Sequence, residues 1–432
     1  MPDQLMEFKA SAPLKAIMTL VVLLSLFASW FVVRWYLGNT IAEYFHPENQ
    51  RLETAQLAVS LAPNDPLPHW RLGNIAQTEL PPDKIGVVVA EYEKAVSLSP
   101  NDYRLWMEFG GALEQAGDFD KAEKALREAV KLAPSYAQPR WHLGNLLVRT
   151  DRYDEGFAQF RLASEADGQF ISQLFNFAWQ LYKDDFEQMK AAVGNSPGMR
   201  AEFSRYLVAH GRFDEGLRVW DSLTEEEKRT NRQSADPIIS SLIDAQRYHQ
   251  AMNMWNQVAP GLAYNASPGH VLDPGFEDNL AHGPGAVFGW QVESNSQVQI
   301  GIDSGQGHSG SRSLRLFFQV RSHIDTINVS QLVPVKPNTN YDFECYLKTE
   351  RLESAETPVI LIVNPANDEP LAGSTAAPSG TSDWQRVALS FKTGEKSEAV
   401  KVKMLRNSCG DSPVCPIFGT VWYDDFDLKP RK

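Results

Sequence analysis

A spacing of 34 residues recurs in the middle of the chain. Four pairs of residues share this interval: Ala95 and Ala129, Pro100 and Pro134, Gly110 and Gly144, and Phe119 and Tyr153. Self-similarity at a fixed period is typical of proteins built from small units that bury their apolar faces by stacking. The spacing therefore predicts an array of helical hairpins from about residue 50 to residue 260, instead of one globular core.

Two of the stacked segments, LWMEFGGALEQAGDFDKAEKALREAVKLAP and PRWHLGNLLVRTDRYDEGFAQFRLASEAD, resemble tetratricopeptide repeats. The order in that family is Leu-Gly, then Gly-Asp-aromatic, then two alanines and a proline. Gly110, Ala122 and Ala129 are small where two antiparallel helices must approach closely, and Pro134 ends the second helix. Binding, and no catalysis, is what this resemblance implies.

The other copies are less regular. An earlier copy holds Gly73 and Ala95, and later copies keep mainly the aromatic residue at the hinge, at Phe186, Phe213 and Tyr248. We expect five or six repeats, of which the last are degenerate.

The resemblance also implies a concave groove for a peptide or partner protein, lined by residues one turn apart on the first helix of each repeat. The residues at these positions are Trp70, Asn74, Met107, Trp141 and Asn145. A spacing of four puts each Trp–Asn pair on one helix face. The asparagines resemble those that hold a peptide backbone or carboxylate, but the basic residues that complete such a clamp are absent. The alternative is that both tryptophans pack against the next repeat.

An apolar stretch precedes the repeats. Residues 16–33 carry no charge and would form a helix of about 27 Å, close to the roughly 30 Å of a bilayer's hydrocarbon core. Basic residues stand before it and aromatic residues at its far end: Lys9 and Lys15, then Trp30, Trp35 and Tyr36. These flanks favour a single-pass anchor with a cytoplasmic N-terminus over a cleaved signal peptide. The bulk of the chain would then be periplasmic or extracellular, on the inner (cytoplasmic) membrane.

After Ala259-Pro260-Gly261, short alternating apolar runs replace the helical pattern. The predicted strands are 287–294, 313–320, 327–335, 341–349, 358–364, 384–393, 399–407 and 420–428. This density of short strands predicts a jelly-roll sandwich. The whole chain is therefore expected to be multi-domain, with a transmembrane anchor (1–40), an all-α tetratricopeptide-repeat solenoid (41–261) and an all-β jelly-roll sandwich (262–432).

The order of landmarks in the last region is DPGFED, a tryptophan at 290, HSGSRSLRL, VSQLVPVKPNTNYDFECYLK, SDWQRVALSF and VWYDDFDL. This series, over about residues 268–430, resembles the family 4 and 9 carbohydrate-binding modules of the galactose-binding-like superfamily. The resemblance implies a structural calcium held by Glu277, Asp424 and Asp425, since oxygen ligands suit that ion. The alternative is that these carboxylates are solvated or cap turns.

Binding of sugar needs flat aromatic faces. The candidates are Tyr423, Trp290 and Trp384. Strict alternation along VWYDDFDL predicts Trp422 in the core and Tyr423 on the surface. Trp290 and Trp384 have packing in the core as the alternative.

The chain has three cysteines, two of which flank the turn-rich sequence GDSPV. A disulfide between Cys409 and Cys415 would add about 2 kcal/mol by loop-entropy arithmetic and would fit an oxidising compartment. Cys345 is expected to be a buried thiol.

The net charge of −13, without a run of Lys and Arg, argues against nucleic-acid binding. The sequence has no P-loop, HExxH, GxSxG or dinucleotide-binding pattern, so we expect no enzyme and no certain cofactor. The sequence thus predicts an extracytoplasmic adaptor in which the repeats bind a protein and the sandwich binds glycan, in polysaccharide assembly or export. The alternative is a purely protein-interaction subunit whose sandwich no longer binds sugar.

Overall fold

The computed structural model describes residues 11–44, 51–259, 265–278, 287–292, 297–318, 327–410 and 415–431. The chain divides into two compact units, Met1–Gly194 and Asn195–Lys432. Lys9 and the predicted domain limit at 261–262 lie outside the described residues. The domain limits predicted above stay a prediction.

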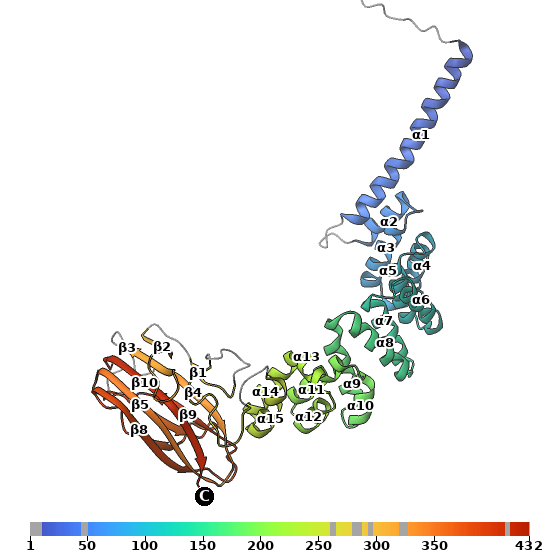
Figure 1. Cartoon of the computed structure of the whole chain (residues 1–432). Coiled ribbons are helices and arrows are strands. Elements are labelled where there is room, and N and C mark those ends of the chain that lie inside the picture. The colour runs from blue at the N-terminus through green and yellow to red at the C-terminus, as the bar shows by residue number, and fades with distance from the viewer. Residues whose placement is uncertain are drawn as a thin grey trace, which may run out of the picture. The chain divides into compact units, whose positions relative to one another are not determined.

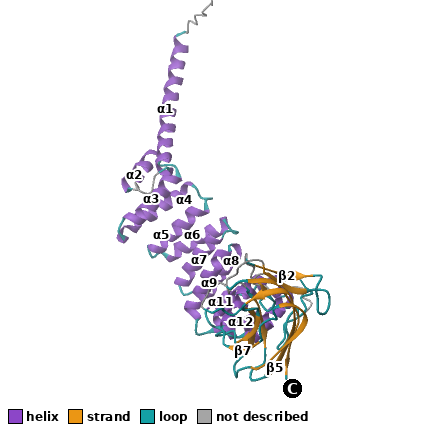
Figure 2. Ribbon diagram, turned by 90° about the vertical axis from the view of Figure 1, so that its left-hand side faces the viewer, coloured by secondary structure: helices purple, strands orange, loops and turns teal. Residues whose placement is uncertain are grey.

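The first unit is helical, and its helices follow one another as antiparallel neighbours (Figures 1 and 2). They are α1 (Ala12–Glu43), α2 (Leu52–Leu61), α3 (Pro66–Glu79), α4 (Ile85–Leu98), α5 (Tyr103–Gln115), α6 (Phe119–Leu132), α7 (Ala137–Arg149), α8 (Tyr153–Ala166), α9 (Ile171–Tyr182) and α10 (Phe186–Val193), with 3₁₀ turns at Pro82–Lys84 and Gly168–Phe170. The hairpins α3–α4, α5–α6 and α7–α8 are the predicted repeats, and the first of them contains the turn at Pro82–Lys84.

Local sequence explains where these helices begin. Asp102 and Asp118 are N-caps whose side chains accept the backbone N–H groups of Arg104 and Lys121. The hinge aromatics predicted from the sequence, Phe119 among them, are each the first residue of the second helix of a hairpin. The others are Tyr153, Phe186, Phe213 and Tyr248.

Glycine sets how closely the two helices of a hairpin approach. A Cβ atom on Gly110 would lie 2.7 Å from Leu126, and one on Gly144 would lie 2.6 Å from the ring of Phe160. Ala129, on the second helix of the α5–α6 hairpin, is fully buried. The close helix–helix contact expected from the small residues is therefore present.

Helix α1 is the one helix in the described part of the chain that is long and apolar enough to cross a membrane. Its side chains are exposed except at its C-terminal end, where Gly38 and Ala42 are buried. A membrane span and an N-terminal signal sequence both have this composition.

The second unit begins with helices α11 (Pro197–Ala209), α12 (Phe213–Asp221), α13 (Glu225–Thr230), α14 (Arg232–Asp244) and α15 (Tyr248–Val258). Trp220, Ile238 and Trp255 lie in their shared core. Phe288, which belongs to the chain after the helices, is buried in the same core, with its ring centroid 5.8 Å from that of Trp255.

The rest of the second unit is an all-β domain of two five-stranded antiparallel sheets (Figure 1). One sheet has the order β1-β4-β9-β6-β7 and the other β2-β3-β10-β5-β8. The strands are β1 (Gln291–Val292), β2 (Val298–Asp303), β3 (Ser313–Phe318), β4 (Val329–Pro334), β5 (Asn340–Ser354), β6 (Val359–Val363), β7 (Pro370–Gly373), β8 (Gly380–Lys392), β9 (Ala399–Leu405) and β10 (Ile417–Pro430). The sequence did not predict β2 or β7.

Strand β10 corrects one prediction. Tyr423 is fully buried with Phe426 and Leu428, so its expected place on the surface is wrong. The cause is a β-bulge at Asp425, which has a φ of 49° and interrupts the pairing with β5. An extra residue reverses the alternation of side chains beyond it. Trp422 therefore lies on the opposite face of the strand from Tyr423 and Phe426.

Candidate binding surfaces

The rim of the predicted groove is built by the first turns of α3 and α5. Trp70 is half-buried and lines a cavity of about 290 Å³ together with Asp102 and Arg104. The remaining lining residues are Pro66, Leu67 and Leu105. The cavity thus combines an indole ring with an arginine and a carboxylate.

A second cavity of about 520 Å³ shares two of these residues, Asp102 and Arg104. Tyr103 and Tyr136 line it, and their ring centroids are 5.2 Å apart. The Arg104 guanidinium donates to the Asp102 carboxylate, which holds the pKa of Asp102 below its ordinary value. The two cavities form one surface, the Arg104 surface, with aromatic rings on both sides of an ion pair.

The two predicted asparagines differ in their contacts. The side-chain oxygen of Asn74 accepts a hydrogen bond of 2.7 Å from the Tyr92 hydroxyl, whose pKa is raised by burial. Asn145 is half-buried on α7. Met107 packs against the core shared by α5, α6 and α7. The hydrogen bond between Asn74 and Tyr92 also links α3 to α4.

Trp141 is a correction to the predicted groove. It is 9% exposed, and its ring centroid lies 4.4 Å from that of Phe160 and 4.9 Å from that of Phe170. Phe177 adds a third ring at 6.1 Å. The aromatic residues of the following helices cover this tryptophan, so it packs as core and presents no face to a ligand.

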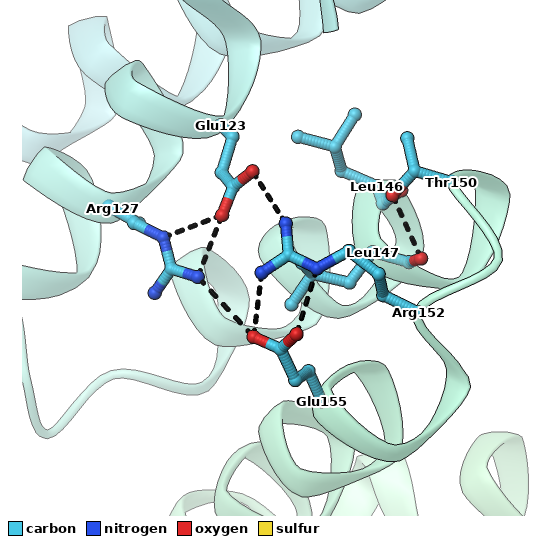
Figure 3. A network of polar contacts seen from close by, with 7 residues as sticks. All are labelled: Glu123, Arg127, Leu146, Leu147, Thr150, Arg152 and Glu155. Atoms are coloured by element: carbon cyan, nitrogen blue, oxygen red, sulfur yellow. Dashed lines mark hydrogen bonds and ion pairs between the residues drawn. The ribbon is translucent and has the colours of Figure 1, made fainter. Parts of the chain in front are cut away.

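A polar network joins the α5–α6 and α7–α8 hairpins (Figure 3). Arg152, at the α7–α8 hinge, donates to Glu155 and to Glu123 of the preceding hairpin, each at 2.7 Å. Arg127 bridges the same two carboxylates. The nearby Thr150 hydroxyl lies 3.1 Å from the Leu146 carbonyl oxygen. These partly exposed pairs join one hairpin to the next.

The three carboxylates predicted to hold calcium do converge on one loop. Asp424 accepts the backbone N–H of His308 at 2.6 Å, and Asp425 accepts the Ser309 hydroxyl at 2.5 Å. Glu277 accepts the backbone N–H groups of Ser311 and Arg312, and these hydrogen bonds lower its pKa. Burial raises the pKa of Asp424. We call this arrangement the loop clasp.

The carboxylates of the loop clasp are held by hydrogen-bond donors. Their oxygens accept N–H and O–H groups, and no three His, Cys, Asp or Glu side chains within the described ranges stand together as metal ligands. The calcium prediction gains no support from these contacts and stays a prediction. Heating the protein with calcium and with a chelator tests it directly.

The three predicted sugar-binding aromatics have different surroundings. Trp290 is 4% exposed and packs in the core against Phe276 and Phe426, and Tyr423 is fully buried, so neither can present a ring to a sugar. Trp384 is half-buried on β8, with its ring centroid 5.6 Å from that of His308.

His308 is stacked on Tyr346 at 3.7 Å, and Tyr346 points away from the core because its strand neighbours Cys345 and Leu347 point into it. Trp384, His308 and Tyr346 thus form an aromatic patch on the outer face of β5 and β8. Sequence reasoning found Trp384 but missed His308 and Tyr346. His308 lies in the patch only because the loop clasp holds it there.

Cys409 and Cys415 are paired in a disulfide, with their Cα atoms 5.5 Å apart. Arg406 donates to the sulfur of Cys415. Cys345 is a buried free thiol whose pKa is raised by burial.

Comparison with known protein families matches residues 89–137 and 107–169 to a tetratricopeptide-repeat model. These residues therefore form tetratricopeptide repeats. No catalytic family is identified. No curated protein matches the sequence.

Among solved structures, the chain is similar to MamA at 13% identity, covering 46% of this chain and 90% of that one, with a TM-score of 0.27. It is similar to a CBM4 module at 10% identity, covering 37% of this chain and 99% of that one, with a TM-score of 0.29. It is also similar to the CBM22-1–GH10 modules of xylanase 10B from Clostridium thermocellum, complexed with xylohexaose, at 13% identity. That match covers 38% of this chain and 29% of the other, with a TM-score of 0.26.

Proposed function

We propose that this chain is a non-catalytic scaffold anchored by α1 in the inner membrane of a cell envelope, with its repeats and sandwich outside the cytoplasm. The repeats bind a partner protein and the sandwich binds glycan, in polysaccharide assembly or export. The observation that carries the proposal is the Arg104 surface, where two adjoining cavities open between first helices of neighbouring repeats.

The chemistry of the Arg104 surface suits a peptide segment. Trp70 and Tyr136 offer aromatic area, and Arg104 can exchange its intramolecular partner Asp102 for a carboxylate on the partner. Aromatic residues and arginine are the types most enriched at the energetic centres of protein interfaces. Asn74, one turn along α3 from Trp70, and Asn145 on α7 would hold the backbone of the bound segment.

A pair of charge reversals tests the protein-binding role. Arg104→Glu should weaken partner recovery from native membranes by at least about tenfold, since it removes a central charged contact. Lys131→Glu makes the same charge change on α6, where Lys131 is exposed and pairs with Glu128. Equal recovery with both variants would contradict the assignment of this surface.

The glycan-binding role is supported by the aromatic patch. A half-buried tryptophan beside a stacked imidazole and phenol offers the flat apolar area that a pyranose ring packs against. On a polysaccharide array, the detergent-solubilised full chain should bind, and Trp384→Ala should abolish binding. Phe418→Ala removes another exposed aromatic of the same domain and serves as the control.

A second function is favoured by the helix–sandwich junction. The His249 backbone N–H donates to Glu398 at 3.0 Å, and the His249 ring contacts the Val335 carbonyl at 2.8 Å. These contacts let the sandwich cap the last hairpin, as a purely protein-interaction subunit would require. A folded chain that binds no glycan on the array would favour this alternative.

A further inference from the structure

The C-terminal part of α1 carries the sequence of a repeat helix. Trp35-Tyr36-Leu37-Gly38-Asn39 has the same W-x-L-G-N pattern as residues 70–74 in α3 and 141–145 in α7. The sequence AVSLAP at 58–63, at the end of α2, likewise matches AVSLSP at 95–100 and AVKLAP at 129–134. The residues before 64 therefore carry the sequence patterns of both the first and the second helix of a repeat.

The glycine of this pattern in α1 also lies close against a second helix. A Cβ atom on Gly38 would lie 2.7 Å from the Cβ of Ala62 and 3.0 Å from the carbonyl oxygen of Ala58. Gly110 and Gly144 also approach the second helices of their own hairpins closely, but at Ala122 and Leu126 and at Gly156 and Phe160, which lie two turns before the residues equivalent to Ala58 and Ala62. Gly38 and Ala42 are also the residues of α1 that are buried.

Two hydrogen bonds fix the junction. The Arg34 guanidinium donates to the Ser60 carbonyl oxygen at 2.8 Å, and the Trp35 indole N–H donates to the Asp65 carboxylate at 2.8 Å. Asp65 is also the N-cap of α3, where it accepts the Leu67 N–H. Helix α1 is thus bonded to the end of α2 and to the start of α3, as Figure 1 shows by their adjacency.

We propose that α1 is at once the membrane anchor and the first helix of the repeat array, so that the groove begins at the membrane surface and its partner is an integral membrane protein. This proposal rests on the membrane anchoring proposed above. The uncharged stretch ends at residue 33, and Asn39 lies six residues, or about 9 Å of helix, beyond it. Trp70 and Asn74 follow on α3, one packed-helix spacing of about 8–10 Å away.

The consequence concerns what can reach the groove. Trp35 and Asn39 occupy on α1 the positions that Trp70 and Asn74 occupy on α3, so they form the first row of the groove. Because α1 continues into the bilayer without a break, this row cannot move away from the membrane. The occupant that reaches both rows is the segment of a membrane protein that adjoins its own membrane span.

The packing is tested in the full chain in lipid nanodiscs. Gly38→Leu should speed hydrogen exchange of the α2 amides at least about tenfold, because the side chain would displace the α2 backbone. Gly86→Leu is the control, since no atom lies within 4 Å of a Cβ there. Unchanged exchange in Gly38→Leu would overturn the assignment of α1 as a repeat helix.

The partner class is tested in native membranes with a photo-crosslinking residue at position 39 or 74. Both positions should label the same protein, and that protein should resist alkaline extraction. Inserting a four-residue Gly-Ser linker between Val33 and Arg34 should lower labelling at least about tenfold while leaving the repeats intact. Labelling of a soluble protein, or labelling unaffected by the linker, would overturn the proposal. Alkaline extraction of the wild-type chain itself would instead refute the anchoring on which it rests.

Discussion

The helical repeats and the β-sandwich distribute their cores differently. In the first unit, separate clusters such as the one around Leu126 and Leu146 join a hairpin to its neighbour. In the sandwich one cluster extends from Val271 to Leu428 and draws on both sheets. A core made of sequence neighbours confines damage to a hairpin or two, whereas a core made of distant strands shares it.

The last hairpin, α14–α15, has neither a core made only of its own sequence neighbours nor a place in the single sandwich core. Its core contains Phe288 and Leu332 from the sandwich region, and the Asn256 side chain exchanges two hydrogen bonds with the backbone of Ala266. Helices α14 and α15 are therefore completed by residues that follow them. The helical sequence pattern ends near residue 259, but the core of the last hairpin continues into the residues of the sandwich region.

The largest effect is expected at this shared core. Phe288→Ala should destabilise the last hairpin by about 3–5 kcal/mol, the usual cost of removing a buried phenylalanine. Hydrogen exchange of the α14 and α15 amides measures it. Phe418→Ala, which removes a side chain 44% exposed, should change their exchange little. If α14 and α15 kept their protection without Phe288, the helices and the sandwich would be separate cores after all.

The next effect tests the local character of the repeats. Gly144→Ala should destabilise the α7–α8 hairpin by about 1–3 kcal/mol, because the new methyl group meets the Phe160 ring at 2.6 Å. Gly111→Ala, in the neighbouring helix α5, meets no atom within 4 Å and should stabilise by about 0.5–1 kcal/mol through helix propensity. Urea unfolding of the two variants gives opposite shifts of the midpoint. Shifts of the same sign would mean that close approach at Gly144 is not what its sequence position encodes.

This difference between the regions decided what the sequence could predict. In the repeats, Gly110 and Gly144 recur because the two helices of each hairpin must approach closely at that position. The 34-residue period therefore predicted both the helical-repeat fold and these close contacts. The repeat at Gly38 was missed because its helix is dominated by the apolar composition of residues 16–33. Trp141 was assigned to the groove because residue type and spacing do not show that Phe170 and Phe177 cover it.

In the sandwich, faces follow from alternation, and a single bulge at Asp425 was enough to bury Tyr423 on the face of Phe426, while Trp422 is buried on the other face. A positive φ at an aspartate leaves no mark in a sequence. The aromatic patch depended on His308, which comes from a loop far from Tyr346 and Trp384 in the chain. Only the loop clasp brings these residues together.

A matched pair of tyrosines sharpens the reassignment of Tyr423. Its hydroxyl is buried and has no hydrogen-bond partner within the described residues, so Tyr423→Phe should leave stability unchanged or raise it by up to about 1 kcal/mol. The Tyr341 hydroxyl instead accepts the Lys336 N–H at 2.9 Å, and Tyr341→Phe should cost about 0.5–1.5 kcal/mol. Calorimetry on both variants compares them. A loss in Tyr423→Phe as large as in Tyr341→Phe would show that its hydroxyl is satisfied.

The smallest effect is expected at a polar link between the two helices of one repeat. Links of this kind in the repeats join side chains, whereas the loop clasp of the sandwich uses backbone N–H groups. Burial lowers the pKa of His69, but its hydrogen bonds to Glu91 at 2.6 Å and to the Pro63 carbonyl raise it more, so the net shift is upward from 6.5. A raised folded-state pKa means that the protonated imidazole stabilises the α3–α4 hairpin fully below about pH 6.5, and that this contribution is lost as pH rises through the folded-state pKa. The urea midpoint should therefore fall between pH 6 and pH 8, and His69→Gln should remove that part of the fall. A pH dependence identical in the two proteins would mean that the ion pair between α3 and α4 adds nothing to the array.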